Sequence, residues 1–433
     1  MSNLTSIRKT MNADSKRRQR LYWIVLAATL VVLPLIFSSS FAVSIMTQIG
    51  IAIIFALSYN MLLGQGGMLS FGHAVYFGLG GFLAMHFMNY VEGGFPLPIP
   101  FLPLIGGLIG LIFGVIFGSF STRRAGTVFA MISLGIAELI ASSSLIFVKF
   151  FGGEEGIAGD RTMGPSFMDI DYASDIEVYY IAAFWTFLAM FAMFWFSRTP
   201  AGRMANAVRE NPERAEFVGY SQRRVRMTSF CASGFFAGLA GGIFAIAYEI
   251  VTEETLGLNQ SGSVLLMAYI GGVGYFVGPV IGAIILTMLS TVLSNYTDVW
   301  LLYLGLIFLS TVLFAPAGLS GLLMMHGPAY KAGRMGLLAV PYLTMAVPAL
   351  TIAIGITGFL ELFHFAHTTS VDDRIMMLYG FASDVDSFVP WAILAALTVS
   401  GIFGVRRAKS GVLDAWASAN APVVQKSAKD GKA

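Results

Sequence analysis

Four polar side chains stand close together in a glycine-rich and otherwise apolar stretch, and they are the first candidates for chemistry. They are Asn60, Gln65, Ser70 and His73. In an apolar environment such side chains must face a partner or a water-filled cavity, and glycines let two backbones approach closely. The stretch therefore predicts either the lining of a solute pathway or a helix-packing seam held by hydrogen bonds, and the sequence leaves both open.

A single carboxylate, Glu138, lies near the middle of an apolar run over residues 126–151. An ionisable side chain within a membrane-spanning helix is costly, which makes it a functional candidate by default. Two roles are open for Glu138: a residue of the solute pathway, or a structural acid that is paired or held protonated by desolvation.

A third pattern is the cluster Gly271, Gly272 and Gly274, followed by Gly278 and Pro279. Clustered glycine and proline interrupt helices. The cluster predicts two short half-spans, 263–275 and 277–293, in place of one continuous span. Discontinuous helices at membrane depth point to transport sites, whereas a glycine-rich helix packed tightly on a neighbour is the alternative.

A charged segment over residues 198–226 contains a short capped helix, predicted over 211–219. Asn211 is a preferred N-cap, Pro212 suits the first helical position, and Gly219 is a natural C-terminal stop. A helix of this kind suits docking into a groove on a cytoplasmic partner. The candidate contact residues are Arg203, Arg209, Asn211, Glu213, Arg214, Phe217 and Gly219.

The composition of the chain indicates which kind of secondary structure must position these residues. Of 433 residues, 56% are hydrophobic and 12% are charged, whereas soluble domains carry ~25% charged residues. The composition excludes a water-soluble enzyme, a nucleic-acid binder and a disordered chain. The apolar runs are continuous, which favours an all-α polytopic transmembrane bundle over a β-barrel.

The predicted bundle has about ten full spans in addition to the half-spans near 263–293, since a span needs ~20 apolar residues. The ten apolar runs are 21–38, 42–63, 69–90, 101–120, 126–151, 178–197, 227–250, 300–323, 337–360 and 388–405. The distribution of Lys and Arg places both termini and the segment 198–226 in the cytoplasm. The acidic segments 152–177 and 361–387 then lie outside.

Four parts follow along the chain. They are a cytoplasmic basic N-terminus over 1–20, a core over 21–325, an extra region over 326–409 with two further spans, and a polar tail over 410–433 that is expected to be disordered.

The sequence has no phosphate-binding glycine loop with its lysine and no metal-ligand spacing among its five histidines. We expect a non-catalytic membrane subunit without a cofactor or metal of its own. If transport is driven by ATP, a partner must supply the hydrolysis.

Together these motifs resemble one family: the membrane-spanning subunits of ABC importers for branched-chain amino acids, urea and short amides, in the longer of two permease types. The resemblance covers roughly residues 40–325. The matching stretches are Asn60 to Ala74, Arg124 to Glu138, Gly152 to Ile157, Gly202 to Gly219 and Gly271 to Ala283. Family members usually stop soon after the equivalent of Leu319, whereas this chain continues for about a hundred residues.

The resemblance implies a permease half in a bacterial-type inner membrane that translocates a small polar solute, branched-chain amino acids first among them. It implies a homologous permease, two cytoplasmic ATPases that use the ATP, and an extracytoplasmic binding protein as partners, with membrane lipid around the bundle and no nucleic acid. The loop from Gly202 to Gly219 would be the coupling helix that meets the ATPase. The alternatives are an autonomous proton-coupled secondary transporter that uses Glu138, and a structural or assembly membrane protein.

Overall fold

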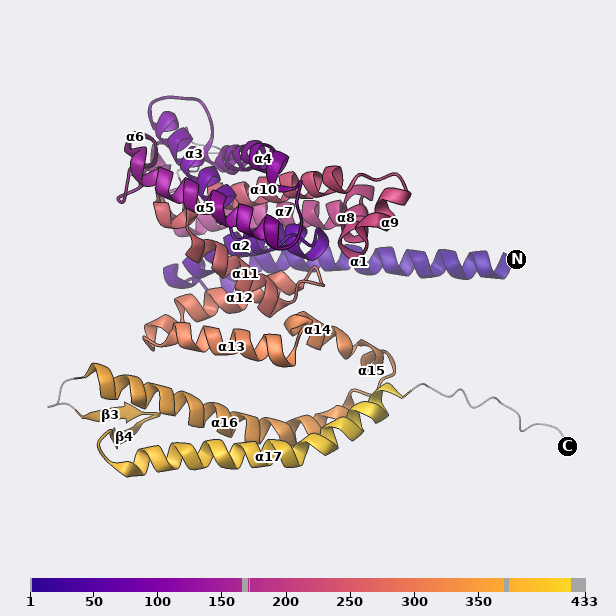
Figure 1. The fold of residues 1–433 in the computed structure, drawn as a ribbon, viewed down its shortest axis with the longest axis vertical. Helices are drawn as coiled ribbons and strands as arrows, with labels where there is room; N and C mark the ends of the chain where they lie inside the picture. The colour runs from indigo at the N-terminus through magenta and orange to yellow at the C-terminus, as the bar shows by residue number, and fades with distance from the viewer. Residues whose placement is uncertain (1, 166–169, 171, 370–373, 422–433) are drawn as a thin grey trace. The chain divides into compact units, whose positions relative to one another are not determined.

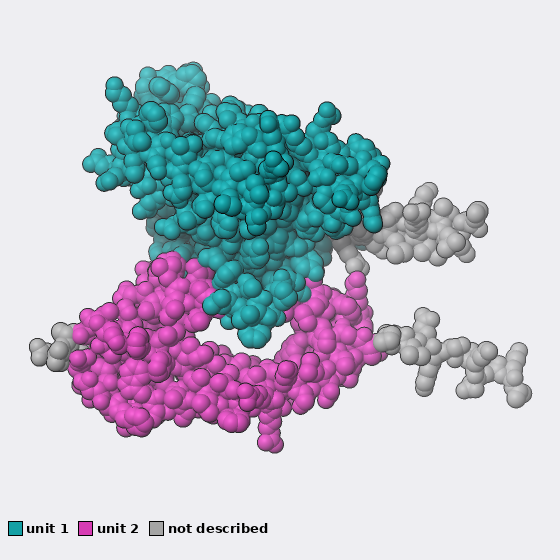
Figure 2. Space-filling view, viewed as in Figure 1, with its two compact units in different colours: residues 1–292, 307–321 teal, residues 293–306, 322–433 magenta. Residues whose placement is uncertain are grey.

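The computed structural model describes residues 2–165, 170, 172–369 and 374–421, and these are folded almost entirely as helices (Figure 1). The chain divides into two compact units, residues 1–292 with 307–321 and residues 293–306 with 322–433 (Figure 2). The C-terminal region expected from residue 326 onward falls in the second unit.

The helices up to residue 217 are α1 (Ser2–Ile36), α2 (Ser40–Asn60), the π-helix η1 (Met61–Gln65), α3 (Ala74–Glu92), α4 (Leu102–Ser121), α5 (Thr127–Ile146), α6 (Val148–Phe151), α7 (Asp175–Arg198), α8 (Pro200–Glu210) and α9 (Pro212–Phe217). The later helices are α10 (Gln222–Tyr248), α11 (Leu258–Gly271), α12 (Gly278–Thr291), α13 (Trp300–Phe314), α14 (Gly318–Met325), α15 (Gly327–Lys331), α16 (Gly336–Thr368) and α17 (Phe388–Asn420). Short 3-10 turns cover Ile99–Phe101, Arg161–Met163, Glu253–Leu256 and Leu293–Asn295. Two antiparallel pairs of strands complete the fold: β1 (Ile157–Ala158) with β2 (Ile250–Val251), and β3 (Ile375–Leu378) with β4 (Phe381–Asp384).

Nine helices of the described part of the chain are long and apolar enough to cross a membrane. A tenth candidate is the pair Trp300–Phe314 and Gly318–Lys331, which is bent by 47°. These helices confirm the predicted all-α polytopic bundle.

The expected span over 69–90 differs at its start, because the chain from Gly66 to His73 is not helical. The π-helix η1 ends α2, and Gly67 has φ +65°, a left-handed conformation that favours glycine. The helix α3 therefore begins only at Ala74.

Glycines build the core of the first unit by letting α3, α4 and α10 pack backbone against backbone. A Cβ on Gly234 of α10 would lie 2.7 Å from the carbonyl oxygen of Gly110 on α4, and a Cβ on Gly81 of α3 would lie 3.2 Å from that of Gly241 on α10. Both distances are shorter than ordinary van der Waals contact, so larger residues at these positions would separate the helices.

The predicted break near residues 263–293 is confirmed. The helix α11 ends at Gly271, α12 begins at Gly278, and Gly272 has φ +110° at the cap of α11. A Cβ on Gly272 would meet the carbonyl of Ala317 and the hydroxyl of Ser320, so the break packs against the turn that starts α14.

In the second unit, α16 and α17 run side by side as an antiparallel hairpin that carries β3 and β4 between them (Figure 1). The helix α17 extends to Asn420, so the expectation of disorder is wrong for residues 410–420. Ala419 is buried against Leu338 and Ala329, and this packing stabilises a helix that polar composition alone does not predict. Residues 422–433 lie outside the described part of the chain.

Candidate functional site

The four polar residues of the glycine-rich stretch lie at the end of α2, in η1 and in the irregular segment that follows. Asn60, Gln65, Ser70 and His73 are all at least nine-tenths buried, with exposed fractions of 4%, 9%, 1% and 1%. The stretch is therefore folded into the interior of the first unit.

Hydrogen bonds and aromatic packing hold the end of this segment in place. The Nε2 atom of His73 lies 2.8 Å from the hydroxyl of Ser58, and the hydroxyl of Tyr59 donates to the carbonyl of Ser70 over 3.0 Å. The imidazole of His73 stacks on the ring of Phe55, with 5.4 Å between the ring centroids. These contacts fit the packing-seam hypothesis for Ser70 and for the Nε2 edge of the His73 ring.

Asn60, Gln65 and His73 each keep a buried polar atom without a protein partner. Within the described residues, no hydrogen bond reaches Asn60 Oδ1, Gln65 Oε1 or His73 Nδ1. Unsatisfied buried polar atoms are uncommon, and they are a feature of sites that bind water or a ligand. The pathway hypothesis is therefore stronger for these three residues than for Ser70.

The two irregular segments of the bundle meet at Gly64 of η1. A Cβ on Gly64 would lie 2.6 Å from the carbonyl oxygen of Val273 and would also meet Asn60 Oδ1. Val273 belongs to the break between α11 and α12, next to Gly272 and Gly274. The structure thus brings the predicted glycine cluster and the predicted Asn60 together, although Gly274 itself has no neighbour within 4 Å of a would-be Cβ.

Arg209 connects this junction to the charged segment 198–226. Its guanidinium Nη1 donates a hydrogen bond to the carbonyl of Gly64. The stem of the same side chain covers Gly67, where a Cβ would lie 2.7 Å from Arg209 Cγ. The sequence singles out Arg209 as a contact for a partner, but in the structure it contacts the chain's own membrane bundle.

The capped helix of the charged segment 198–226 forms as predicted, although α9 is shorter than the expected 211–219. The side chain of Asn211 accepts from the amide of Arg214 over 2.9 Å, and Gly219 follows the helix with φ +90°. Ala215 faces inward, whereas Phe217 is 90% exposed. The apolar cluster that holds α8 and α9 on the start of α10 consists of Ala205, Val208, Ala215 and Val225.

Arg203, Glu213 and Arg214 are exposed on this segment. They surround an exposed apolar part of the same surface, in which Phe217 is 90% exposed and the adjacent Val218 is 68% exposed. An aromatic side chain that is almost fully exposed at the tip of a well-anchored helix is typical of a docking surface.

Glu138 lies apart from the buried polar residues, on the outer surface of α5. The same helix turns Ser133 inward, where its hydroxyl accepts from the amide of Phe71 over 3.0 Å. Glu138 is exposed, as are Met131 and Gly135 on the same face. The structure thus separates Glu138 from Asn60 and Gln65.

The sequence did not predict an ion-pair cluster around Arg161, at the opposite end of α10 from the charged segment 198–226. Arg161 is 9% exposed, and its Nη2 lies 3.5 Å from Asp175 while its Nη1 lies 3.9 Å from Glu249. Its guanidinium also donates to backbone carbonyls at the C-terminus of α10, including that of Ala247 over 3.3 Å. The only signal in the sequence is one arginine within an acidic segment.

The cluster ties the segment after α6 to α10. The amide of Arg161 donates to Glu249 Oε1 over 2.9 Å, and β1 pairs with β2 beside it. Hydrogen bonds from Thr162 hold the pKa of the neighbouring Asp160 below its usual value. A cavity of about 70 Å³ lies next to Arg161 and Asp175.

The part of the chain that the structure describes contains no group of three or more His, Cys, Asp or Glu side chains that could hold a metal ion. The chemistry that remains is that of a polytopic membrane transport protein. It has interrupted helices, buried unsatisfied amide oxygens and a capped helix outside the bundle.

The chain belongs to a family of ABC transporter permeases. The family described as branched-chain amino acid transport system / permease component matches residues 41–316. The chain is thus a permease subunit of an ABC importer, and a multi-pass membrane protein.

Individual relatives agree with this assignment. The high-affinity branched-chain amino acid transport system permease protein LivM of Escherichia coli is 27% identical over 323 residues, which cover 70% of this chain and 75% of the relative. A probable LivM of Methanocaldococcus jannaschii is 23% identical over 64% of this chain and 92% of its own length. The galactose/methyl galactoside import permease protein MglC of Haemophilus influenzae is 24% identical over 66% of this chain and 89% of its own length. No solved structure matches the chain.

Proposed function

We propose that this permease works in a complex with a homologous permease, two cytoplasmic ATPase subunits and an extracytoplasmic solute-binding protein, and that it imports branched-chain amino acids or closely related solutes. The observation that carries the proposal is the exposure of Phe217 on α9, which is 90%. The preceding helix α8 contacts the membrane bundle through the hydrogen bond from Arg209 to Gly64. An exposed aromatic side chain at this position suits a permease that binds an ATPase, because the interface with the ATPase would bury it. Both termini lie in the cytoplasm in this proposal, and the membrane is a bacterial-type inner membrane.

The second permease covers the face of α5 that carries Glu138. A carboxylate in the middle of a span is costly against lipid, and it is normally found facing a protein partner or a water-filled cavity. Because Glu138 is exposed on this chain, a partner subunit or the pathway between the two subunits is what supplies that environment.

The substrate class follows from the relatives and from the character of the buried site. The relatives named for branched-chain amino acid transport match the chain over most of its length. Asn60 and Gln65 offer neutral oxygens and no fixed charge, an arrangement that suits a zwitterion bound through its dipoles. The relative named for galactose makes sugars the first competing class.

The mechanism is alternating access driven from the cytoplasm. ATP binding and hydrolysis occur on the partner subunits and move α9. The cluster of Ala205, Val208 and Ala215 makes α8 move with α9, and Arg209 passes the displacement to Gly64. The junction of η1 with the break after α11 then rearranges, which opens or closes the region of Asn60 and Gln65.

Reconstitution of the full chain with its homologous permease, ATPases and binding protein in liposomes tests the proposal. We expect ATP-dependent uptake of leucine, isoleucine and valine, with little uptake of galactose, urea or amides. Uptake driven by a proton gradient without ATP would instead support an autonomous secondary transporter. Preferred uptake of galactose would be consistent with the proposed complex, but it would overturn the proposed substrate class.

A further inference from the structure

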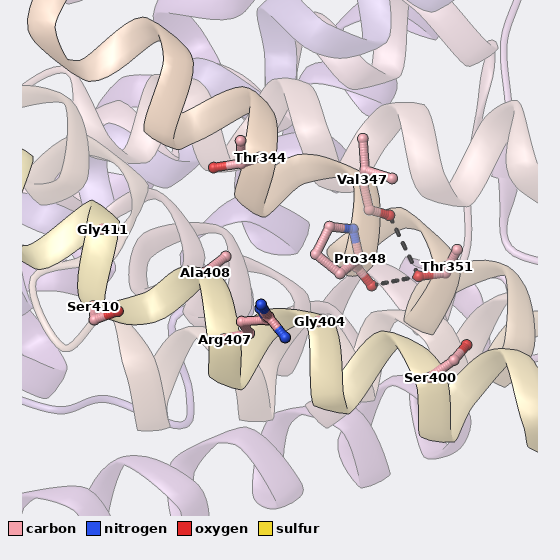
Figure 3. A pocket seen from close by; sticks show the side chains of 10 residues that line it. All are labelled: Thr344, Val347, Pro348, Thr351, Ser400, Gly404, Arg407, Ala408, Ser410 and Gly411. Atoms are coloured by element: carbon pink, nitrogen blue, oxygen red, sulfur yellow. Dashed lines mark hydrogen bonds between the residues drawn. The ribbon is translucent and has the colours of Figure 1, made fainter.

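A groove in the second unit lies between α16 and α17, outside the region matched by the family. It has a volume of about 640 Å³. Its lining residues come from both helices (Figure 3): Thr344, Val347, Pro348, Thr351, Ser400, Gly404, Arg407, Ala408, Ser410 and Gly411. Arg407 is the one charged residue among them.

Contacts between the two helices lie within the groove and beyond it. Among the lining residues, a Cβ on Gly404 would lie 2.5 Å from Pro348 Cβ, so the helices are in close contact there. Beyond the groove, toward the end of α17, Leu338 and Ala419 are buried against each other with Tyr342 and Trp416. Pro348 lacks an amide hydrogen, which leaves the carbonyl of Thr344 without its usual helical donor.

The depth of the groove follows from the lengths of the helices. The hydrocarbon core takes ~20 helical residues. Counted from the outer ends of the hairpin, at Thr368 and Phe388, about 20 residues lead to Pro348 on α16 and to Arg407 on α17. Both sides of the groove thus reach the level of the lipid head groups on the side where Arg406, Arg407 and Lys409 gather.

The polar atoms of the lining are of two kinds. Arg407 is exposed, and no carboxylate or carbonyl of the described residues binds its guanidinium. The hydroxyls of Thr344, Thr351 and Ser400 already donate to backbone carbonyls at 2.8, 2.8 and 3.0 Å, which leaves their oxygens free to accept. The groove therefore combines one strong donor for an anion with several acceptors.

We propose that this groove binds the head group of a phospholipid whose phosphodiester pairs with Arg407 and whose head group donates hydrogen bonds to the hydroxyl oxygens. Glycerol and ethanolamine head groups carry such donors, whereas choline does not. Basic pockets between transmembrane helices are known sites for phospholipid head groups. The inference is independent of the proposed transport function, and it gives the extra C-terminal hairpin a binding role.

The test is native mass spectrometry of the purified full-length chain, titrated with phosphatidylglycerol, phosphatidylethanolamine or phosphatidylcholine of the same acyl chains. We expect the first two lipids to bind more tightly than phosphatidylcholine. Arg407→Gln should weaken phosphatidylglycerol binding about fivefold, the loss expected for one charge. Arg406→Gln is the matched control, because it removes a neighbouring charge that does not line the groove, and it should leave binding unchanged.

A second variant tests the groove without touching the charge. Gly411 has open space around a would-be Cβ, so Gly411→Leu places a side chain in the groove while the helix is kept. We expect it to reduce lipid binding as Arg407→Gln does. Equal losses in Arg406→Gln and Arg407→Gln, undiminished binding in Gly411→Leu, or equal binding of phosphatidylcholine would each overturn the proposal. Displacement of the lipid by millimolar inorganic phosphate would instead identify a site for a free anion.

Discussion

Arg209, on the helix α8, donates a hydrogen bond to the carbonyl of Gly64, near the end of the π-helix η1. The two residues are 145 positions apart in the sequence. Gly64 also lies against Val273, in the break between α11 and α12. One side chain thus joins the charged segment 198–226 to the place where both irregular segments of the bundle meet.

Replacing Arg209 should uncouple ATP hydrolysis from transport. In Arg209→Gln the guanidinium that reaches Gly64 is lost, while α8 and α9 keep their apolar cluster. We expect the complex to assemble and hydrolyse ATP, with at least a tenfold fall in solute imported per ATP. The matched control is Arg224→Gln, which removes an exposed arginine near the start of α10 that does not belong to the docking surface. Equal coupling ratios in the two variants would show that Arg209 carries no signal to the bundle.

A side chain at Gly67 should disturb the same contact from the other side. Gly67 has φ +65°, and its Cβ would lie 2.7 Å from Arg209 Cγ. We expect Gly67→Ala to lower the free energy of unfolding by about 1–3 kcal/mol, the usual cost of a sparsely populated backbone conformation. Thermal unfolding in detergent measures this, and Gly262→Ala, in open space on α11, is the control that should not destabilise the chain.

Local signals in the sequence predicted much of this region. Asn211, Pro212 and Gly219 were sufficient to place a capped helix, because caps and stops depend on adjacent residues. The break after Gly271 was predictable for the same reason. Composition alone was sufficient for an all-α membrane bundle.

The features that the sequence did not predict depend on contacts between distant segments. Nothing near Gly64 in the sequence indicates a π-helix or a bond to Arg209. The role of Arg161 depends on Asp175 and Glu249, which other parts of the chain bring to it. The outward direction of Glu138 depends on which face of α5 its neighbours cover, and a mid-span position does not determine that.

Truncation of Phe217 should weaken the docking of the ATPase. The side chain is 90% exposed, so Phe217→Ala removes no packing within the chain and should insert and fold normally. A buried aromatic at a protein interface contributes ~2 kcal/mol or more, which corresponds to roughly thirtyfold weaker binding. Co-purification with the ATPase measures this. Phe217→Leu retains most of the apolar area and should retain most of the binding, and parental docking in Phe217→Ala would argue against α9 as the coupling helix.

Neutralising Glu138 separates a pathway role from a structural one. Glu138→Gln keeps the size and hydrogen-bonding capacity of the side chain and removes its charge. If Glu138 lines the pathway between two permeases, we expect lower uptake or an altered pH dependence, with unchanged assembly of the pair. Uptake equal to that of the parent from pH 5 to 8 would make Glu138 a structural residue of the interface.

Replacing Arg161 should destabilise the fold at the C-terminal end of α10. In Arg161→Gln, carbonyls at the C-terminus of α10 and the carboxylates of Asp175 and Glu249 lose their shared donor. Removal of one partner of a buried ion pair costs about 3–5 kcal/mol. Because the side chain of Asp175 is 46% exposed and that of Glu249 is 36% exposed, we expect about 2 kcal/mol here. Thermal unfolding of the purified chain checks this value, and Arg124→Gln, an exposed arginine elsewhere, should change the unfolding temperature little. If the two variants unfold at the same temperature, the cluster does not stabilise the fold, and a role for Arg161 in contacting a partner would have to be sought instead.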